Sequence, residues 1–137
     1  MEQSKTTLIY GIDCPYISLE WEKGHLFVSN AVLRLIGKPS GIHLRWNAVK
    51  RILIIEATHI NDPNGFPVIG RQYERRGSLS IGSVTLIHEI WSITKWDMSL
   101  RYKIVAKYNE LANIAIFEMQ DAVAFEILQN AEDKIEG

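Results

Sequence analysis

The sequence contains a single cysteine, Cys14, among its 137 residues. One thiol excludes an internal disulfide and any zinc site built from several cysteines. It also favours a reducing compartment, which we expect to be the cytoplasm. The histidines lack the H-x-x-x-H spacing of metal ligands on a helix; they are His25, His43, His59 and His88. We therefore expect no metal centre and no cofactor.

Long apolar runs are also missing. No stretch approaches the roughly 20 apolar residues that span a bilayer. The first residues, MEQSKTTLIYGID, lack the apolar segment and the small-residue cleavage site of a secretory signal. These absences predict a protein that is neither secreted nor inserted in a membrane.

Catalytic fingerprints are absent as well. The sequence has no G-x-S-x-G, P-loop or dinucleotide-binding glycine motif. No basic residue adjoins Cys14 in the sequence, so nothing there activates its thiol as a nucleophile. We expect a protein that is not an enzyme.

The chain has no overall excess of positive charge, because 15 Lys and Arg face 16 Asp and Glu. The charge is unevenly spread. Residues 1–58 carry seven basic and five acidic side chains, a net +2, whereas residues 77–137 carry five and nine, a net −4. A polyanionic partner would therefore meet the first half of the chain.

Alternating apolar residues predict a β-rich fold with short helices. Ser29 is the expected N-cap of the first helix, and Gly37 is expected to end it in a left-handed conformation. The predicted strands are residues 17–22, 26–28, 42–46, 51–57, 79–81, 98–106 and 112–119, and the predicted helices are residues 30–36, 84–93 and 120–130.

Three short stretches recur in the same order. Gly24-x-Leu-x-Val matches Gly77-x-Leu-x-Ile, Leu44-Arg-Trp matches Leu100-Arg-Tyr, and Ile52-Leu-Ile-Ile-Glu matches Ile114-Ala-Ile-Phe-Glu. The separation grows from 53 to 56 to 62 residues, which predicts a duplication with insertions in the second copy. The predicted units are residues 1–58, a leader plus the first copy, and 77–128, the second copy. Residues 59–76 form a linker, and 129–137 a loose tail.

The stretch GHLFVSNAVLRLIG, followed by an apolar hairpin, resembles the AbrB type of swapped-hairpin module of bacterial transition-state regulators and MazE-type antitoxins. Two copies in one chain resemble the MraZ arrangement. The resemblance implies two βαββ units that interlock into one small, pseudo-two-fold β-barrel. A single unit of this size buries too little apolar surface to be stable alone, so the two copies are expected to fold as one domain.

The resemblance implies a transcription regulator that binds double-stranded DNA through basic residues beside the glycine strand and on the helix. The sequence departs from the family pattern there. His25 follows the glycine, and the helix keeps Arg34 but has Leu33 in place of the second basic residue. The second copy has Ser78 and Ile87 where the first has His25 and Arg34. The D-x-x-x-R signature of MraZ is not found at the matching point of either copy.

The candidate nucleic-acid-binding residues combine the positions that match the family with basic residues on the predicted hairpins: His25, Arg34, Arg45, Lys50, Arg51, Arg101 and Lys103. We expect Arg34, Arg45 and Arg51 of the first copy to make the main contacts, with Arg101 and Lys103 in support. The alternative is a non-catalytic protein-interaction module, antitoxin-like or structural, that has lost DNA binding. Its contact surface would be the second helix around Trp91 and Trp96, or the acidic tail. A homo-oligomer is compatible with either function.

Overall fold

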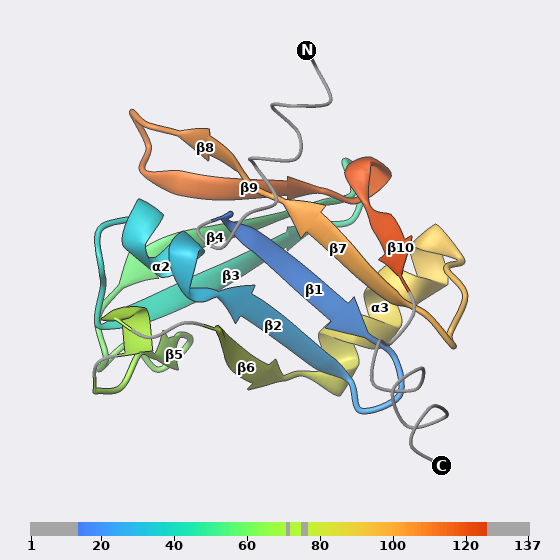
Figure 1. The fold of residues 1–137 in the computed structure, drawn as a ribbon, viewed down its shortest axis with the longest axis horizontal. Coiled ribbons are helices and arrows are strands. Elements are labelled where there is room, and N and C mark those ends of the chain that lie inside the picture. Colours follow the sequence, from blue (N-terminus) through green and yellow to red (C-terminus); the bar gives the residue numbers. More distant parts are fainter. Residues whose placement is uncertain (1–13, 71, 75–76, 126–137) are drawn as a thin grey trace, which may run out of the picture.

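The computed structural model describes residues 14–70, 72–74 and 77–125. The protein is mainly β, with two five-stranded antiparallel sheets that pack face to face (Figure 1). Sheet A has the strand order β10-β7-β1-β2-β6 and sheet B the order β5-β3-β4-β9-β8. The predicted leader before Cys14 and the predicted tail after Phe125 lie outside the described residues.

Sheet A is built around the hairpin of β1 and β2. Its strands are β1 (Tyr16–Glu20), β2 (His25–Ser29), β6 (Ser78–Gly82), β7 (Arg101–Val105) and β10 (Val123–Phe125). Alternate residues point into the sandwich, so that Ile17, Leu26 and Ile104 are fully buried. The other residues of these strands form the outer face of sheet A.

Sheet B supplies the other half of the core. Its strands are β3 (Gly41–Asn47), β4 (Ile52–Thr58), β5 (Phe66–Pro67), β8 (Lys107–Asn109) and β9 (Ile114–Glu118). Leu53, Ile55 and Phe117 are fully buried between the sheets. The alternate isoleucines Ile54 and Ile116 lie on the outer face, where they are partly buried.

In the described part of the chain, two helices and two short 3-10 turns join these sheets: α2 (Asn30–Leu35), α3 (Val84–Thr94), η1 (Gln72–Glu74) and η2 (Met119–Asp121). Gly37 has the predicted positive φ, 99°. Ser29 precedes α2, but the prediction that its hydroxyl caps the helix is wrong. That hydroxyl accepts a hydrogen bond from the Tyr16 amide and donates to the Cys14 carbonyl.

The first predicted repeat coincides with an approximately two-fold arrangement of β2 and β6. Phe27 lies opposite Ser80, which is 53 residues later in the chain. Two matched hydrogen bonds flank this pair, from the Asn30 amide to the Gly77 carbonyl and from the Ser83 amide to the Gly24 carbonyl, both 2.9 Å. The strand and the start of the following helix are therefore related in the two halves.

The β3–β4 and β8–β9 hairpins show that the second of the three sequence matches was wrong. Ile54 pairs with Ile116, and the residue opposite Ile54 on β3 is Arg45, whereas Lys107 of β8 lies opposite Ile116. The partner of Arg45 in the repeat is thus Lys107, 62 residues later, and not Arg101. The separation is 62 residues through the whole hairpin, because the nine extra residues of the second copy all precede it, in α3 and in the segment between α3 and the hairpin.

The two hairpin turns agree in detail. The side-chain oxygen of Asn47 accepts a hydrogen bond from the Lys50 amide at 2.9 Å, and that of Asn109 accepts one from the Ala112 amide at 3.0 Å. Each turn ends in a left-handed residue, Arg51 with φ 57° or Asn113 with φ 54°. The two hairpins therefore have turns of the same conformation.

Two other secondary-structure predictions require correction. The predicted linker contains a strand, β5, whose Phe66 pairs with Ile42 at the edge of sheet B. The helix predicted over residues 120–130 does not begin at 120, because Val123–Phe125 forms β10 and pairs with β7. The apolar residues that predicted this helix equally suit a short edge strand.

Candidate nucleic-acid interface

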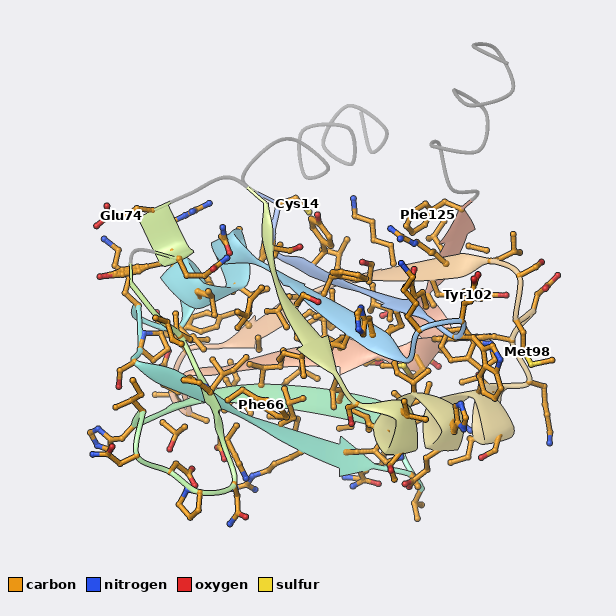
Figure 2. The ribbon with its side chains drawn as sticks, turned by 90° about the horizontal axis from the view of Figure 1, so that it is seen from below. Cys14, Phe66, Glu74, Met98, Tyr102 and Phe125 are labelled. Atoms are coloured by element: carbon orange, nitrogen blue, oxygen red, sulfur yellow. The ribbon has the colours of Figure 1, made fainter. Side chains whose placement is uncertain are left out.

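Three of the seven predicted residues share the outer face of sheet A. Lys103 lies opposite Ser18, which in turn lies opposite Phe27 on β2. Side chains two residues apart on a strand share a face, so Arg101 and His25 lie on the same face as Lys103 and Phe27. Arg101 lies opposite Phe125 on β10, and His25 lies opposite Glu20 on β1. We call the set His25, Arg101, Lys103, Tyr16, Phe27 and Phe125 the basic-aromatic face. Figure 2 shows Phe125 projecting from sheet A on the side away from sheet B.

Arg101 is held on this face by a carboxylate and an aromatic ring. Its guanidinium contacts the Glu20 carboxylate twice, at 2.9 Å from Nε and 2.8 Å from Nη2, and lies 5.4 Å from the Phe27 ring centroid. The Glu20 side chain is only 10% exposed. The arginine therefore neutralises a carboxylate that would otherwise be buried alone.

Aromatic rings support the other two basic residues. The Lys103 ammonium lies 4.1 Å from the Tyr16 ring centroid, and the His25 ring packs edge-on against Phe27 at 5.8 Å. A cation over an aromatic face is held at that place by the ring quadrupole. The basic residues were predicted from the sequence and the aromatic ones were not, although Phe27 alternates with His25 along one strand.

Arg45 lies on the opposite side of the molecule, on the outer face of sheet B. Glu56 Oε1 is 3.0 Å from both Arg45 Nε and His43 Nδ1. The equivalent pair in the second copy joins Lys107 Nζ to Glu118 at 2.8 Å. Sheet B thus presents a matched ion pair on each side of its isoleucines, and both cations are neutralised.

The remaining three predicted residues lie elsewhere. Arg34 of α2 donates from Nη1 to the Tyr73 carbonyl at 2.8 Å. Lys50 and Arg51 belong to the β3–β4 turn, beside a groove of about 270 Å³ that Trp96 also lines. The seven predicted residues therefore occupy four places, and the basic-aromatic face is the one that holds three of them.

The Glu56 carboxylate on sheet B has a lowered pKa, and the Cys14 thiol has a raised pKa. Burial raises the pKa of Glu56, but hydrogen bonds from His43 and Arg45 outweigh it and leave that pKa lowered. Burial also raises the pKa of the Cys14 thiol, and the charge of Lys103 offsets only part of that effect. The thiol is therefore protonated near neutral pH.

The predicted protein-contact helix has a mostly buried aromatic face. Trp91 is 4% exposed and packs edge-to-face against both Trp96 and Tyr102. Beside it, Trp21 stacks on His88 at 4.1 Å, and the two rings line a shallow groove of about 320 Å³. Trp91 is thus a core residue, whereas its neighbours form the exposed part of this surface. The acidic tail lies outside the described residues.

Within residues 14–70, 72–74 and 77–125, no cluster of three or more His, Cys, Asp or Glu side chains could hold a metal ion. Neither helix in these ranges has the length and apolar character needed to cross a membrane. Comparison with known proteins gives no matching family model, curated protein or solved structure.

Proposed function

We propose that this protein is a DNA-binding transcription regulator of the AbrB-like type and that it contacts double-stranded DNA through the basic-aromatic face. One observation carries the proposal: His25, Arg101 and Lys103 come from two strands and contact the rings of Phe27 and Tyr16 on one sheet face. Arginine and lysine bind phosphate oxygens, and arginine also reads guanine edges.

The symmetry of the fold supports the family resemblance. A swapped-hairpin fold built from two copies brings equivalent strands together around one axis, and both β2–β6 and β4–β9 pair in that way. Together with the glycine-strand pattern around His25, this pairing favours the interlocked barrel. Arg45, which lies on the other face beside Glu56, is not part of the proposed DNA surface.

The charge on this face sets the strength of binding. Arg101 and Lys103 contribute two cations, and Glu20 removes one charge. Two phosphate contacts are therefore an upper limit, and the logarithm of the binding constant should fall with the logarithm of salt concentration with a slope no steeper than about −2. We expect weak binding that is readily detected only at low salt.

Fluorescence anisotropy with labelled duplex DNA, at low and at physiological salt, tests the proposal. The His25→Ala/Lys103→Ala variant should bind several-fold more weakly and show a shallower salt dependence. The Arg45→Ala/Lys107→Ala variant is the matched control, because it removes two cations from the opposite sheet and should bind as the unmodified protein does. Equal losses in both variants would contradict an interface on sheet A.

A protein-interaction module that has lost DNA binding is the second candidate. It is favoured by Val49 and Leu111, which are 93% and 101% exposed at the same position of the two hairpin turns. Large aliphatic side chains in full contact with water lower their free energy when a protein partner covers them. Absence of any duplex binding at low salt would favour this candidate over the first.

A further inference from the structure

The two hairpin turns match in shape but differ in charge. Val49 and Leu111 occupy equivalent positions, and both are essentially fully exposed. The first turn continues with Lys50 and Arg51, whereas Leu111 follows Glu110 in a turn without basic residues. We call residues 109–113 the acidic tip.

A groove lies at the other end of the molecule from the acidic tip. Its volume is about 270 Å³, and it is lined by Lys50 and Arg51 of the β3–β4 turn, by Trp96 after α3, and by Met119 of η2. Glu118 also lines it, with its carboxylate held by Lys107 at 2.8 Å. In Figure 1 the β8–β9 turn lies at the left, whereas η2 and the end of α3 lie at the right.

Tip and groove are complementary in chemistry. Leu111 offers an unburied aliphatic side chain, and Trp96 offers apolar surface beside two cations, whereas Met119 is almost fully buried at the base. Docking would bring Glu110 toward Lys50 and Arg51, and opposite charges at an interface favour the encounter and fix its orientation. The first turn would lack this complementarity, because its own cations would meet those of the groove.

We propose that the acidic tip of one copy of this chain docks into the Lys50–Trp96 groove of a second copy. The contact is heterologous, since it joins different surfaces of the two molecules. In a pair, one copy keeps an unused groove and the other keeps an unused tip, so further copies can add until a ring closes or a filament grows. This inference goes beyond DNA binding and does not depend on it.

A single turn in a groove covers less surface than a standard protein interface of about 1,600 Å² in total. The association is therefore weak and depends on concentration. Sedimentation velocity of the full chain, from micromolar to millimolar concentration, should show a weight-average mass that rises above the 15.7 kDa of one chain.

Two variants separate the two halves of the contact. Leu111→Asp disables the tip, and Lys50→Glu/Arg51→Glu disables the groove; all three side chains are exposed, so neither variant disturbs the core. Each variant alone should remain monomeric. An equimolar mixture should form a pair with twice the monomer mass and nothing larger, because one intact tip and one intact groove meet only once.

Ile69→Asp is the matched control, since Ile69 is an exposed aliphatic residue, 70% accessible, that belongs to neither surface. It should associate as the unmodified chain does. The proposal is overturned if the unmodified chain is monomeric at millimolar concentration, or if Leu111→Asp associates normally. It is also overturned if the mixture of the two variants stays monomeric.

Discussion

Ile54 and Ile116 lie directly opposite each other where β4 pairs with β9, and they occupy the same position in the two halves of the chain. Phe27 and Ser80 have the same relationship in sheet A. Because a two-fold axis between antiparallel strands must pass between equivalent residues, these two pairs mark where one approximate axis crosses both sheets. The two halves of the chain are therefore joined by the β2–β6 pair at one edge of sheet A and by the β4–β9 pair within sheet B.

The repeated turn allows a direct comparison of equivalent residues. Asn47→Ala and Asn109→Ala each remove one hydrogen bond from a side-chain oxygen to the backbone amide three residues later. Each should lower the free energy of unfolding by about 1 kcal/mol. The double variant should lose the sum, because the turns lie at opposite ends of the β4–β9 pair and share no partner.

Urea denaturation monitored by tryptophan fluorescence measures these losses. Glu110→Ala, in the same turn as Asn109 but without a hydrogen bond to the turn backbone, is the control and should be nearly neutral. A loss confined to one of the two asparagines would show that the turns are not energetically equivalent.

The sequence predicted α2, α3 and most of the strands up to residue 119, because its apolar residues alternate in strands that are buried on one face, but it missed β5, β8 and β10. It also found the first and third matches of the repeat. In the third match, Ile54 and Ile116 lie in strands that are both rich in apolar residues. The middle match failed for a physical reason. Arg101 is followed by an aromatic residue, as Arg45 is, and local sequence cannot tell that nine inserted residues precede the β8–β9 hairpin.

The candidate site was less predictable than the fold. Whether a strand residue faces the core or the solvent follows from alternation, but which solvent-facing residues meet depends on the strand order. β1 lies between β2 and β7, which come from different halves of the chain. Only this order brings Phe27 to Arg101 and separates both from Arg45.

Arg101 and Arg45 should differ strongly in their effects on stability. Arg101→Ala leaves the Glu20 carboxylate, 10% exposed, without its partner, and should cost about 3 kcal/mol. Arg45→Ala breaks a pair whose arginine side chain is 62% exposed, and should cost less than about 1 kcal/mol.

A double-mutant cycle over Glu20→Ala and Arg101→Ala checks this difference in chemical denaturation. The double variant should be more stable than the sum of the single losses predicts, because no buried charge remains. Purely additive losses would contradict the coupling of these two side chains.

Stability should fall in acid partly through the two matched ion pairs of sheet B. Hydrogen bonds from His43 and Arg45, acting against burial, lower the pKa of Glu56. The hydrogen bond from Lys107 lowers the pKa of Glu118. A carboxylate with a lowered pKa in the folded state stabilises the protein above its unfolded pKa, about 4.3, and loses that contribution as the pH falls through the folded value.

The Glu56→Gln/Glu118→Gln variant should therefore lose less stability than the unmodified protein between about pH 5 and about pH 3. Urea midpoints measured across this range provide the comparison. Asp97, whose pKa is lowered by hydrogen bonds from Ser99, is retained in the variant and should leave it some acid dependence. Parallel pH profiles for the two proteins would contradict the assignment to sheet B.

Gly24 should be the least replaceable of the glycines with positive φ. Its φ is 65°, and a Cβ atom there would lie 2.7 Å from Val84 Cγ2 and 3.0 Å from Val84 Cα. Gly70 has the same φ of 65° but nothing within 4 Å of a Cβ. The Gly70→Ala variant therefore measures only the cost of an alanine in a left-handed backbone conformation. Gly70→Ala should cost about 1 kcal/mol, and Gly24→Ala should cost about 1–3 kcal/mol more because the turn is forced away from α3.

Thermal and urea denaturation of both variants give the difference, which measures how closely the β1–β2 turn approaches the start of α3. Adding Val84→Ala to Gly24→Ala should restore only part of the loss, because the Val84 Cα atom stays in place. Equal losses for Gly24→Ala and Gly70→Ala would mean that the turn moves freely. The hydrogen bond from the Ser83 amide to the Gly24 carbonyl, which ties the first half of the chain to the second, would then be weaker than its 2.9 Å length indicates.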